Sequence, residues 1–286
     1  MAANFAAGDR VLFIDTKERR YLVTLETTGE FHSHAGFVPH SNVIEDYHIL
    51  QTTRDEYIIR EIRNSMNDAG IVVEFSKGEA GKGQHEINLR YADALTMADR
   101  HAIYKNGAKE IAALSGRSIT FMAKYSMEEV GSSCHLHSSV WSADGERSLM
   151  WDEGAPHHMS DTMRGWLGGI IATGAEFAWL FAPYVNSYKR YQPESWAPTA
   201  LAWGRDNRTC GYRIVGHGAG FRMESRVPGA DVNPYLAYAA TIAAGLHGIE
   251  HGDSLALEFG QKRRCECAAT RAKLPDFRTE RGQPNR

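Results

Sequence analysis

The stretch 131–141, GSSCHLHSSVW, gives the strongest indication of fold and function in this sequence. In an extended strand, alternate side chains share one face, so His135, His137 and Ser139 point to the same side. Two imidazoles and one hydroxyl on a single strand face indicate a polar cleft rather than the inside of a hydrophobic core. The stretch therefore predicts a strand that lines such a cleft.

Three carboxylates elsewhere in the chain could act together with these histidines as metal ligands. Glu79 and Glu86 stand at the two ends of the glycine-containing turn AGKGQH. Glu224 lies between Arg222 and Arg226, and in a strand all three side chains share one face. Carboxylates together with one imidazole form a hard, oxygen-rich ligand set. That set favours Mg²⁺ or Mn²⁺ over zinc.

The bulk composition bounds the class of protein. A chain of 286 residues with 43% hydrophobic and 23% charged residues is typical of one large globular domain or two small ones. Its net charge of −3 gives no reason to expect a nucleic-acid partner. Four cysteines are too few for a secreted disulfide scaffold, which predicts reduced thiols and a cytoplasmic location. No apolar run of about 18 residues is present, so no membrane span is expected.

Residues 1–45 form the first of three expected parts. Short β-rich runs at 11–14, 21–25 and 31–34, separated by charged or glycine-containing turns, predict a small antiparallel β segment. The runs GDRV, RRY and GEFHSHAGFVPH resemble the small N-terminal β domain of actinobacterial tRNA (adenine-58-N1)-methyltransferases. The cofactor-binding domain of those enzymes does not follow. His32, His34 and His40 are interpreted as surface histidines rather than metal ligands.

The second part, 46–257, mixes helical and strand patterns without regular βαβ alternation, which predicts an α+β fold. Thr53 and Glu56 have the spacing of a capping box, which predicts a helix from there to Gly70. Asp144 and Gly145 predict a hairpin turn. The other expected elements are strands at 71–75 and 119–123 and helices at 92–114, 160–181 and 234–247.

The third part, 258–286, has no hydrophobic periodicity. From Gln261 onward it contains eight lysines and arginines against three acidic residues, which predicts a disordered tail. A chain whose three parts differ in this way fits a gene fusion, a rearrangement or a frame error.

Residues 46–257 resemble the catalytic domain of the glutamine synthetase superfamily, and most closely its type I-like branch of γ-glutamyl-amine ligases. Five motifs in the family's order cover about three-quarters of the chain, and this makes the resemblance specific. The motifs are EAGKGQHE at 79–86, GSSCHLH at 131–137, NSYKR at 186–190, RDNR with a further arginine at 205–213, and ESR followed by NPY at 224–235.

The resemblance implies an antiparallel sheet with helices and an ATP-dependent reaction. ATP activates the γ-carboxylate of glutamate, and ammonia or a small amine then displaces phosphate. Glu79 and Glu86 would hold the Mg²⁺ or Mn²⁺ ion on the glutamate side, and His135 and Glu224 the ion on the nucleotide side. Taken alone, Glu79 and Glu86 also fit ordinary solvated loop acids.

The resemblance assigns the remaining site residues as well. Arg208, Arg226 and Arg190 match catalytic arginines, and guanidinium forks bind phosphate and carboxylate bidentately. The implied glutamate site comprises Gly131, Arg190, Arg213 and Trp196. The implied ATP site comprises His137, Ser139, Arg208 and Arg213. Any single arginine also fits a surface ion pair.

Two departures from the family pattern bear on activity. Trp196 stands where glutamine synthetases carry a flap glutamate that helps to deprotonate ammonium, which favours a larger amine such as a polyamine or ethanolamine. A Glu-x-Glu strand, which gives one ligand to each metal, has no match before Asp46. The N-terminal domain that completes a neighbour's active site in the family's homo-oligomers is not recognised either. The alternative hypothesis is therefore a catalytically inactive fusion or remnant.

Overall fold

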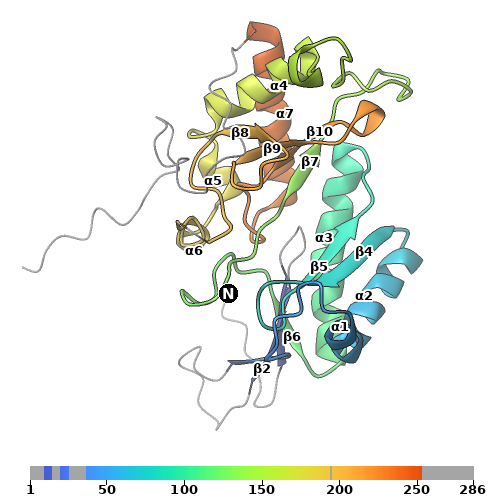
Figure 1. Ribbon diagram of the computed structural model, residues 1–286. Helices are drawn as coiled ribbons and strands as arrows, with labels where there is room; N and C mark the ends of the chain where they lie inside the picture. The colour runs from blue at the N-terminus through green and yellow to red at the C-terminus, as the bar shows by residue number, and fades with distance from the viewer. Residues whose placement is uncertain (1–9, 15–19, 26–36, 194, 253–286) are drawn as a thin grey trace, which may run out of the picture. The chain divides into compact units, whose positions relative to one another are not determined.

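The computed structural model describes residues 10–14, 20–25, 37–193 and 195–252 (Figure 1). The chain divides into two compact units. The first unit comprises Met1–Cys134 and Gly229–Tyr235, and the second comprises His135–Pro228 and Leu236–Arg286. The predicted tail at 258–286 and the expected strand at 31–34 lie outside the described residues. Among the described residues, no helix has the length and apolar character needed to cross a membrane.

The first unit is built on a six-stranded mixed sheet. Strand β1 runs parallel to β5 and β6 and antiparallel to β2, and β4 pairs antiparallel with β5. The strands lie in the order β3-β2-β6-β1-β5-β4. Their bounds are Arg10–Ile14 (β1), Arg20–Leu25 (β2), Phe37–Pro39 (β3), Val73–Gly78 (β4), His85–Leu89 (β5) and Ser118–Thr120 (β6).

Strands β1 to β3 fall in the segment that was expected to form a separate β part. They pair with β5 and β6, which come from the synthetase-like region, so the structure places both regions in one sheet. The domain boundary near residue 45 stays a prediction.

Three helices accompany this sheet. They are α1 (Ile49–Asp55), α2 (Tyr57–Asp68) and α3 (Ala94–Leu114). Helix α3 begins where Asp93 accepts a hydrogen bond from the Thr96 amide at 3.0 Å. It ends before Gly116, whose φ of 65° lies in the left-handed region that favours glycine. The predicted helix at 92–114 therefore forms with nearly the expected bounds.

The predicted capping box is wrong. Thr53 lies inside α1, where its hydroxyl donates to the carbonyl of Ile49 at 2.9 Å. Threonine hydroxyls commonly bond back to the fourth preceding carbonyl within helices, so the residue type alone does not mark a helix start. Glu56 is the residue before α2, and its carboxylate pairs with Arg63 rather than with a backbone amide.

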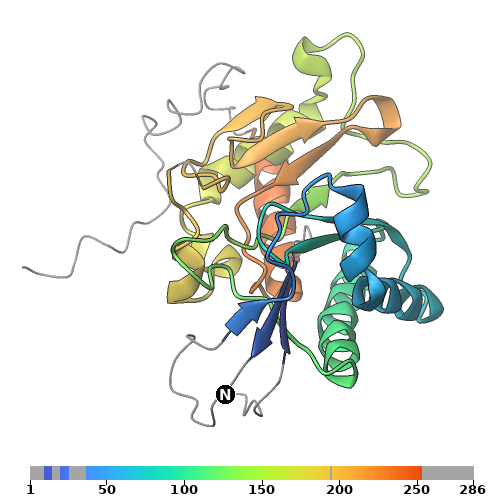
Figure 2. The same ribbon diagram turned by 60° about the horizontal axis from the view of Figure 1, so that its bottom comes forward.

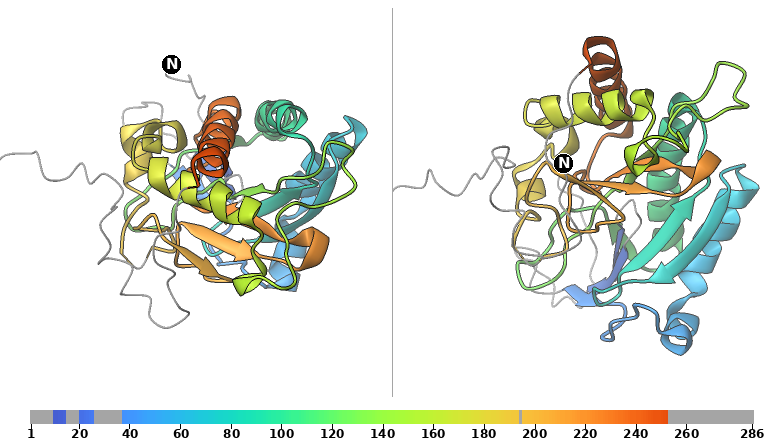
Figure 3. Two further views of the ribbon diagram at one scale, coloured as in Figure 1. Left: turned by 90° about the horizontal axis from the view of Figure 1, so that it is seen from above. Right: turned by 45° about the horizontal axis from the view of Figure 1, so that its top comes forward.

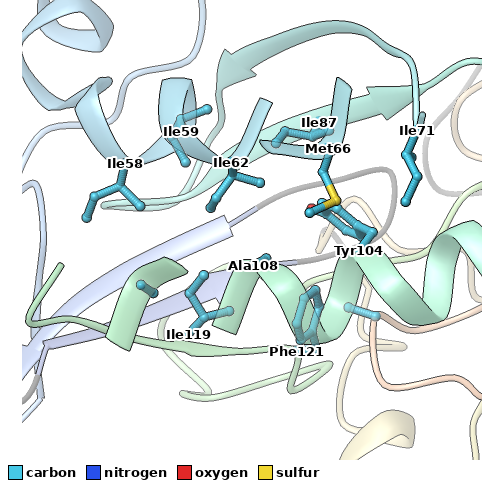
Figure 4. Packing of buried hydrophobic residues seen from close by; sticks show 12 residues of the cluster. Ile58, Ile59, Ile62, Met66, Ile71, Ile87, Tyr104, Ala108, Ile119 and Phe121 are labelled. Carbon is cyan, nitrogen blue, oxygen red and sulfur yellow. The ribbon is translucent and has the colours of Figure 1, made fainter. Parts of the chain in front are cut away.

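The core of the first unit lies where α2 and α3 pack on the sheet, and Figure 4 shows their side chains pointing toward one another. Ile58, Ile62 and Met66 recur at helical spacing along α2 and are buried, as the sequence predicted. Tyr104 of α3 and Phe121 meet edge to face with ring centroids 6.3 Å apart. The same cluster also contains Ile59, Ile71, Ile87, Ala108, Ala112, Ile119 and Ala230.

The second unit contains a four-stranded sheet with the order β7-β10-β9-β8. Strand β10 is antiparallel to both β7 and β9, while β8 runs parallel to β9. Figure 2 shows the orange strands of this sheet side by side. The bounds are Leu136–Ser138 (β7), Trp203–Arg205 (β8), Tyr212–Val215 (β9) and Arg222–Ser225 (β10).

The helices of the second unit follow the predicted pattern with one correction. The Ser160 hydroxyl caps α4 by accepting from the Met163 amide at 3.0 Å, as expected. The predicted helix at 160–181 is interrupted, however, because α4 ends at Thr173. Gly174, a weak helix former, follows it. The helices are α4 (Asp161–Thr173), α5 (Ala178–Phe181), α6 (Val185–Tyr188) and α7 (Pro234–His251), with 3₁₀ turns at Pro156–His158 and Gly218–Gly220.

Helices α4 and α7 cross closely, as both views in Figure 3 show. A Cβ atom placed on Gly169 of α4 would lie 2.1 Å from the carbonyl oxygen of Ala244 and 2.5 Å from the amide nitrogen of Gly248, both on α7. These neighbours are backbone atoms, so they cannot move aside as a flexible side chain does. The absence of a side chain at Gly169 therefore permits the crossing.

We expect Gly169→Ala to lower the free energy of unfolding by about 1–3 kcal/mol, because overpacking outweighs the gain in helix propensity. The measurement is urea denaturation followed by circular dichroism. Gly154→Ala is the matched control, since a Cβ there meets only an ordinary contact at 3.7 Å from Asp152. Equal midpoints for the two variants would contradict the close crossing.

Buried His101 gives the first unit a predictable acid sensitivity. Burial in α3, with the nearby charge of Lys105, lowers the pKa of His101 to about 3. In the unfolded chain this imidazole takes up its proton near pH 6.5, so the unfolded state binds more protons between pH 6.5 and 3. Stability is therefore fully present above pH 6.5 and is lost as the pH falls toward 3.

We expect His101→Gln to flatten the decline of unfolding free energy between pH 6.5 and pH 4, by an amount on the order of a few kcal/mol. Thermal melts across this range measure the effect. His247→Gln serves as the control, because that imidazole is exposed. A decline of unchanged steepness in His101→Gln would contradict the assignment.

Candidate active site

Glu224, in the middle of β10, is fully buried and organises the sheet of the second unit. It stands directly opposite His137 of β7 and Arg213 of β9. Its Oε1 accepts a hydrogen bond from Arg226 at 2.7 Å and lies 3.2 Å from His135 Nδ1. Its Oε2 accepts from Arg213 at 2.7 Å. One carboxylate thus holds an imidazole and two guanidinium groups in place.

Arg213 connects this cluster to the surface. Its guanidinium also donates to Asp206, whose side chain is exposed. Burial alone would lower the pKa of Arg213, but the charge of Glu224 and the hydrogen bond to Asp206 raise it. Arg213 therefore keeps its positive charge beside Glu224. Arg226 is almost completely buried.

The outer part of β7 carries the predicted nucleotide-side residues. His137 is exposed, and its Nδ1 accepts from the Nε of Arg222 at 3.0 Å. Ser139 lies just beyond the end of β7, and its hydroxyl accepts from the Trp141 indole at 2.9 Å. Ser138 accepts instead from Trp166 of α4 at 3.1 Å. The side chains alternate between the two faces of β7 as the spacing of the sequence requires.

Arg190 occupies a different environment from the one expected of a ligand for a substrate carboxylate. It is almost completely buried, and its Nη2 donates to the carbonyl oxygens of Pro228 at 2.9 Å and of Val227. The hydroxyl of Tyr191 donates to the same Val227 carbonyl at 2.7 Å. The described contacts of Arg190 therefore serve the backbone that follows Arg226, and its role in substrate binding stays a prediction.

Arg208 and Trp196 both lie near the surface of the second unit. Arg208, between β8 and β9, is exposed and makes no ion pair within the part of the chain that the structure describes. The side chain of Trp196 is 52% exposed. Its φ of 63° lies in the left-handed region, where a bulky residue is strained. The predicted roles of Arg208 and Trp196 in binding stay predictions.

In the first unit, Glu79 and Glu86 are both buried and share one cation. The ammonium of Lys77 lies 2.6 Å from Glu79 Oε1 and 3.8 Å from Glu86 Oε2, and donates to Asp46 at 2.9 Å. Burial alone would lower the pKa of Lys77, but Glu79, with Asp46 and Glu86, raises it above its ordinary value.

Sequence reasoning missed Lys77 and Asp46. Lys77 is two residues before Glu79 and stands directly opposite Glu86 in the β4–β5 pair. A lysine at alternate spacing from a predicted ligand was a signal in the sequence. Asp46 gave no such signal, because it comes from a distant segment.

Gln84 holds the loop between Glu79 and Glu86 in shape. Its side-chain oxygen accepts from the Gly81 amide at 2.9 Å, and its carbonyl accepts from the Glu79 amide at 2.8 Å. The side-chain amide also donates to the carbonyl of Gly131 at 3.3 Å. Gly131, a predicted glutamate-binding residue, is thus buried beside the loop that joins Glu79 to Glu86.

The carboxylate oxygens are suitable ligands for a divalent ion, but too few of them lie together to form a complete site. No group of three or more histidine, cysteine, aspartate or glutamate side chains gathers closely enough to hold a metal among the described residues. The predicted ligands form two pairs, Glu79 with Glu86 and His135 with Glu224, one pair in each unit. Mg²⁺ is commonly held by one or two carboxylates together with water and substrate phosphates, so each pair fits as part of a site.

The family model for the catalytic domain of glutamine synthetase matches residues 13–262. The chain belongs to the glutamine synthetase family. It is 55% identical over 218 residues to γ-glutamylethanolamide synthetase of Streptomyces coelicolor, covering 76% of this chain and 46% of that protein. It is 44% identical over 206 residues to glutamate–isopropylamine ligase of a Pseudomonas species, covering 72% and 45%.

The fold agrees with solved structures of the family. The structure titled GmaS/ADP complex aligns with a TM-score of 0.74 and 35% identity, over 82% of this chain and 55% of that one. Apo GmaS aligns with a TM-score of 0.73 and 36% identity, over 80% and 53%. The predicted α+β, glutamine synthetase-like fold is therefore confirmed. The chain spans about half the length of the curated relatives that it matches.

We expect Glu224→Gln to lower the free energy of unfolding by about 3 kcal/mol or more, because it leaves the buried Arg226 and the partly buried Arg213 without their carboxylate. Thermal denaturation of the purified chain measures this loss. Asp206→Asn is the matched control. It also removes a carboxylate from Arg213, but an exposed one that is worth at most about 1 kcal/mol. Equal losses in the two variants would contradict the central role of Glu224.

Proposed function

We propose that this protein is an ATP-dependent ligase that joins an amine to the γ-carboxylate of glutamate through a γ-glutamyl phosphate. The carrying observation is the buried Glu224 with His135, Arg213 and Arg226 around it, in a chain of the glutamine synthetase family. Phosphoryl transfer needs fixed positive charge around the transferred group, and this cluster is fixed by a buried carboxylate.

The reaction has two steps that these residues would serve. A γ-carboxylate oxygen of glutamate attacks the γ-phosphorus of ATP and releases ADP. The amine nitrogen then attacks the γ-carbonyl carbon, phosphate leaves, and the nitrogen loses a proton. Arg213 and Arg226 would neutralise charge on the phosphoryl group, and Arg208, which is exposed, would approach it from solvent.

Divalent cations complete the proposal. Glu79 and Glu86 would hold one Mg²⁺ or Mn²⁺ ion, and His135 with Glu224 would hold another. Such ions would supply positive charge that offsets the negative charge of the phosphate groups. The described residues supply two ligands to each ion, so we expect weak binding by the chain itself. His137 and Ser139 would contact the nucleotide, and Gly131 and Arg190 the glutamate.

An organic amine is the proposed acceptor. Two relatives carry the names of an ethanolamide synthetase and an isopropylamine ligase, and both names denote organic amines. In this chain the exposed, apolar Trp196 stands in the flap where a carboxylate would favour ammonium. Glutamine synthetase activity with ammonia is the neighbouring possibility, since several relatives at 38% identity bear that name.

A second candidate is an inactive member of the family. The observation that favours it is the count of two predicted ligands per ion among the described residues.

Assembly into homo-oligomers and a cytoplasmic location belong to the proposed ligase function as well. The location is supported by the small number of cysteines, four in 286 residues.

We expect the purified chain, with ATP, Mg²⁺ and glutamate, to release phosphate faster with ethanolamine, isopropylamine or a polyamine than with ammonia. The kcat/KM for the best organic amine should exceed that for ammonia by about 10²-fold or more, because a positioned base for ammonium is missing. Initial rates of phosphate release across the amine panel measure this preference.

Two variants at Trp196 sharpen the experiment. Trp196→Glu should raise the rate with ammonia relative to the best amine, whereas Trp196→Phe should keep the preference. Ammonia turnover equal to that of the best amine would contradict the proposed acceptor. Absence of phosphate release with every acceptor would favour the inactive member instead.

A further inference from the structure

The ammonium group of Lys77 lies among three carboxylates of the first unit. It is 2.6 Å from Glu79, 3.8 Å from Glu86 and 2.9 Å from Asp46. Its position over the ring of Tyr47, 4.7 Å from the centroid, adds a cation–π contact. Lys77 is therefore the cation that the described structure provides for this group of acids.

The carboxylates around the Lys77 ammonium differ in burial. The side chains of Glu79 and Glu86 are 6% and 7% exposed, whereas that of Asp46 is 33% exposed. Tyr47 is exposed as well. The ammonium therefore has two sets of partners: a buried pair of predicted metal ligands, and an outer pair that takes no part in the predicted metal site.

The buried pair, Glu79 and Glu86, needs a cation close to it. Two carboxylates buried side by side repel each other and lose hydration, so both resist ionisation unless a positive charge is close. Lysine suits this task, because its ammonium is a compact charge on a flexible four-carbon stem. The same stem allows the charge to turn away from Glu79 while it keeps its contacts with Asp46 and Tyr47.

A divalent cation would compete for the same carboxylate oxygens. With Lys77 in place, the carboxylates already contact one positive charge, and a Mg²⁺ or Mn²⁺ ion beside the ammonium would meet like-charge repulsion. Metal binding at Glu79 and Glu86 is therefore coupled to the position of Lys77. The hydrogen bond to Asp46 favours the position in which the Lys77 ammonium has turned away from the glutamates.

We propose that Lys77 is an internal counter-ion for Glu79 and Glu86, which withdraws to Asp46 and Tyr47 when a divalent cation binds the two glutamates. The inference rests on the proposed function, because it assumes that these glutamates are metal ligands. It adds two positioning residues, Lys77 and Asp46, that set the affinity of the site for its ion.

The proposal gives opposite signs for two substitutions. Lys77→Met removes the competing charge, so Mn²⁺ should bind about tenfold more tightly, the factor expected for one charge-assisted contact. Asp46→Asn weakens the outer contact of the ammonium, so Lys77 should stay on Glu79 and Mn²⁺ should bind several-fold more weakly. A lysine whose role is only to stabilise the fold would not produce this reversal of sign.

The experiment is a calorimetric titration of the full chain with Mn²⁺, without nucleotide or glutamate, and with thermal melts of each variant with and without the ion. Lys82→Met is the matched control. Lys82 lies on the loop between the two glutamates, and the variant loses the same charge, but the Lys82 ammonium faces Glu129 at 3.8 Å rather than the glutamate pair. We expect Lys82→Met to bind Mn²⁺ as the unaltered chain does. We also expect Lys77→Met to melt at a lower temperature without the ion and to gain more from adding it.

The outcomes separate this inference from the proposed function. If Glu86→Ala removes one Mn²⁺ site but Lys77→Met leaves the affinity of that site unchanged or weaker, the counter-ion role is overturned and the metal site stands. If Glu86→Ala keeps every Mn²⁺ site at the affinity of the unaltered chain, or if no variant binds Mn²⁺, both fail. If Lys77→Met does not fold, Asp46→Asn decides alone, and an unchanged affinity in that variant overturns the inference.

Discussion

The second unit depends on the burial of one carboxylate. Glu224 is fully enclosed in the sheet, and an ionised carboxylate in that position is stable only with close positive partners. The order β7-β10-β9 supplies them, because it places Glu224 between a strand preceded by His135 and a strand that carries Arg213. Any change that removes the carboxylate leaves two guanidinium groups and an imidazole without their common partner. The same pairing that stabilises the sheet therefore positions the residues that the proposed chemistry needs.

The first unit also contains buried carboxylates, and a different kind of cation accompanies them. Glu79 and Glu86 are neutralised by an ammonium rather than by guanidinium groups. Arginine forms a planar, rigid fork that suits a fixed arrangement, whereas lysine is a mobile point charge. The difference is consistent with the two proposed tasks. The arginines around Glu224 must stay in place when phosphate arrives, and the lysine beside Glu79 must give up its position to an ion.

Sequence periodicity predicted what depends on local backbone geometry. The alternation of Leu136, His137 and Ser138 along β7 follows from the period of a strand, and the Ser160 cap follows from the need of helix amides for acceptors. The misread cap at Thr53 has a local cause too, because the same hydroxyl serves equally well inside a helix. The contacts of Lys77 with Asp46 and of Arg190 with the 226–228 backbone could not be predicted in this way. They join segments 31 and 36–38 residues apart, so no local period of the sequence relates them.

Arg190 links the segment that precedes Trp196 to the backbone that follows Arg226. Its guanidinium binds the carbonyls that follow Arg226, and its own carbonyl accepts from the Ser195 hydroxyl at 3.0 Å. Ser195 directly precedes Trp196, whose strained backbone must be held by such neighbouring contacts. In the proposed reaction, an amine that displaces Trp196 would therefore also shift the backbone beside Arg226, because Arg190 contacts both segments.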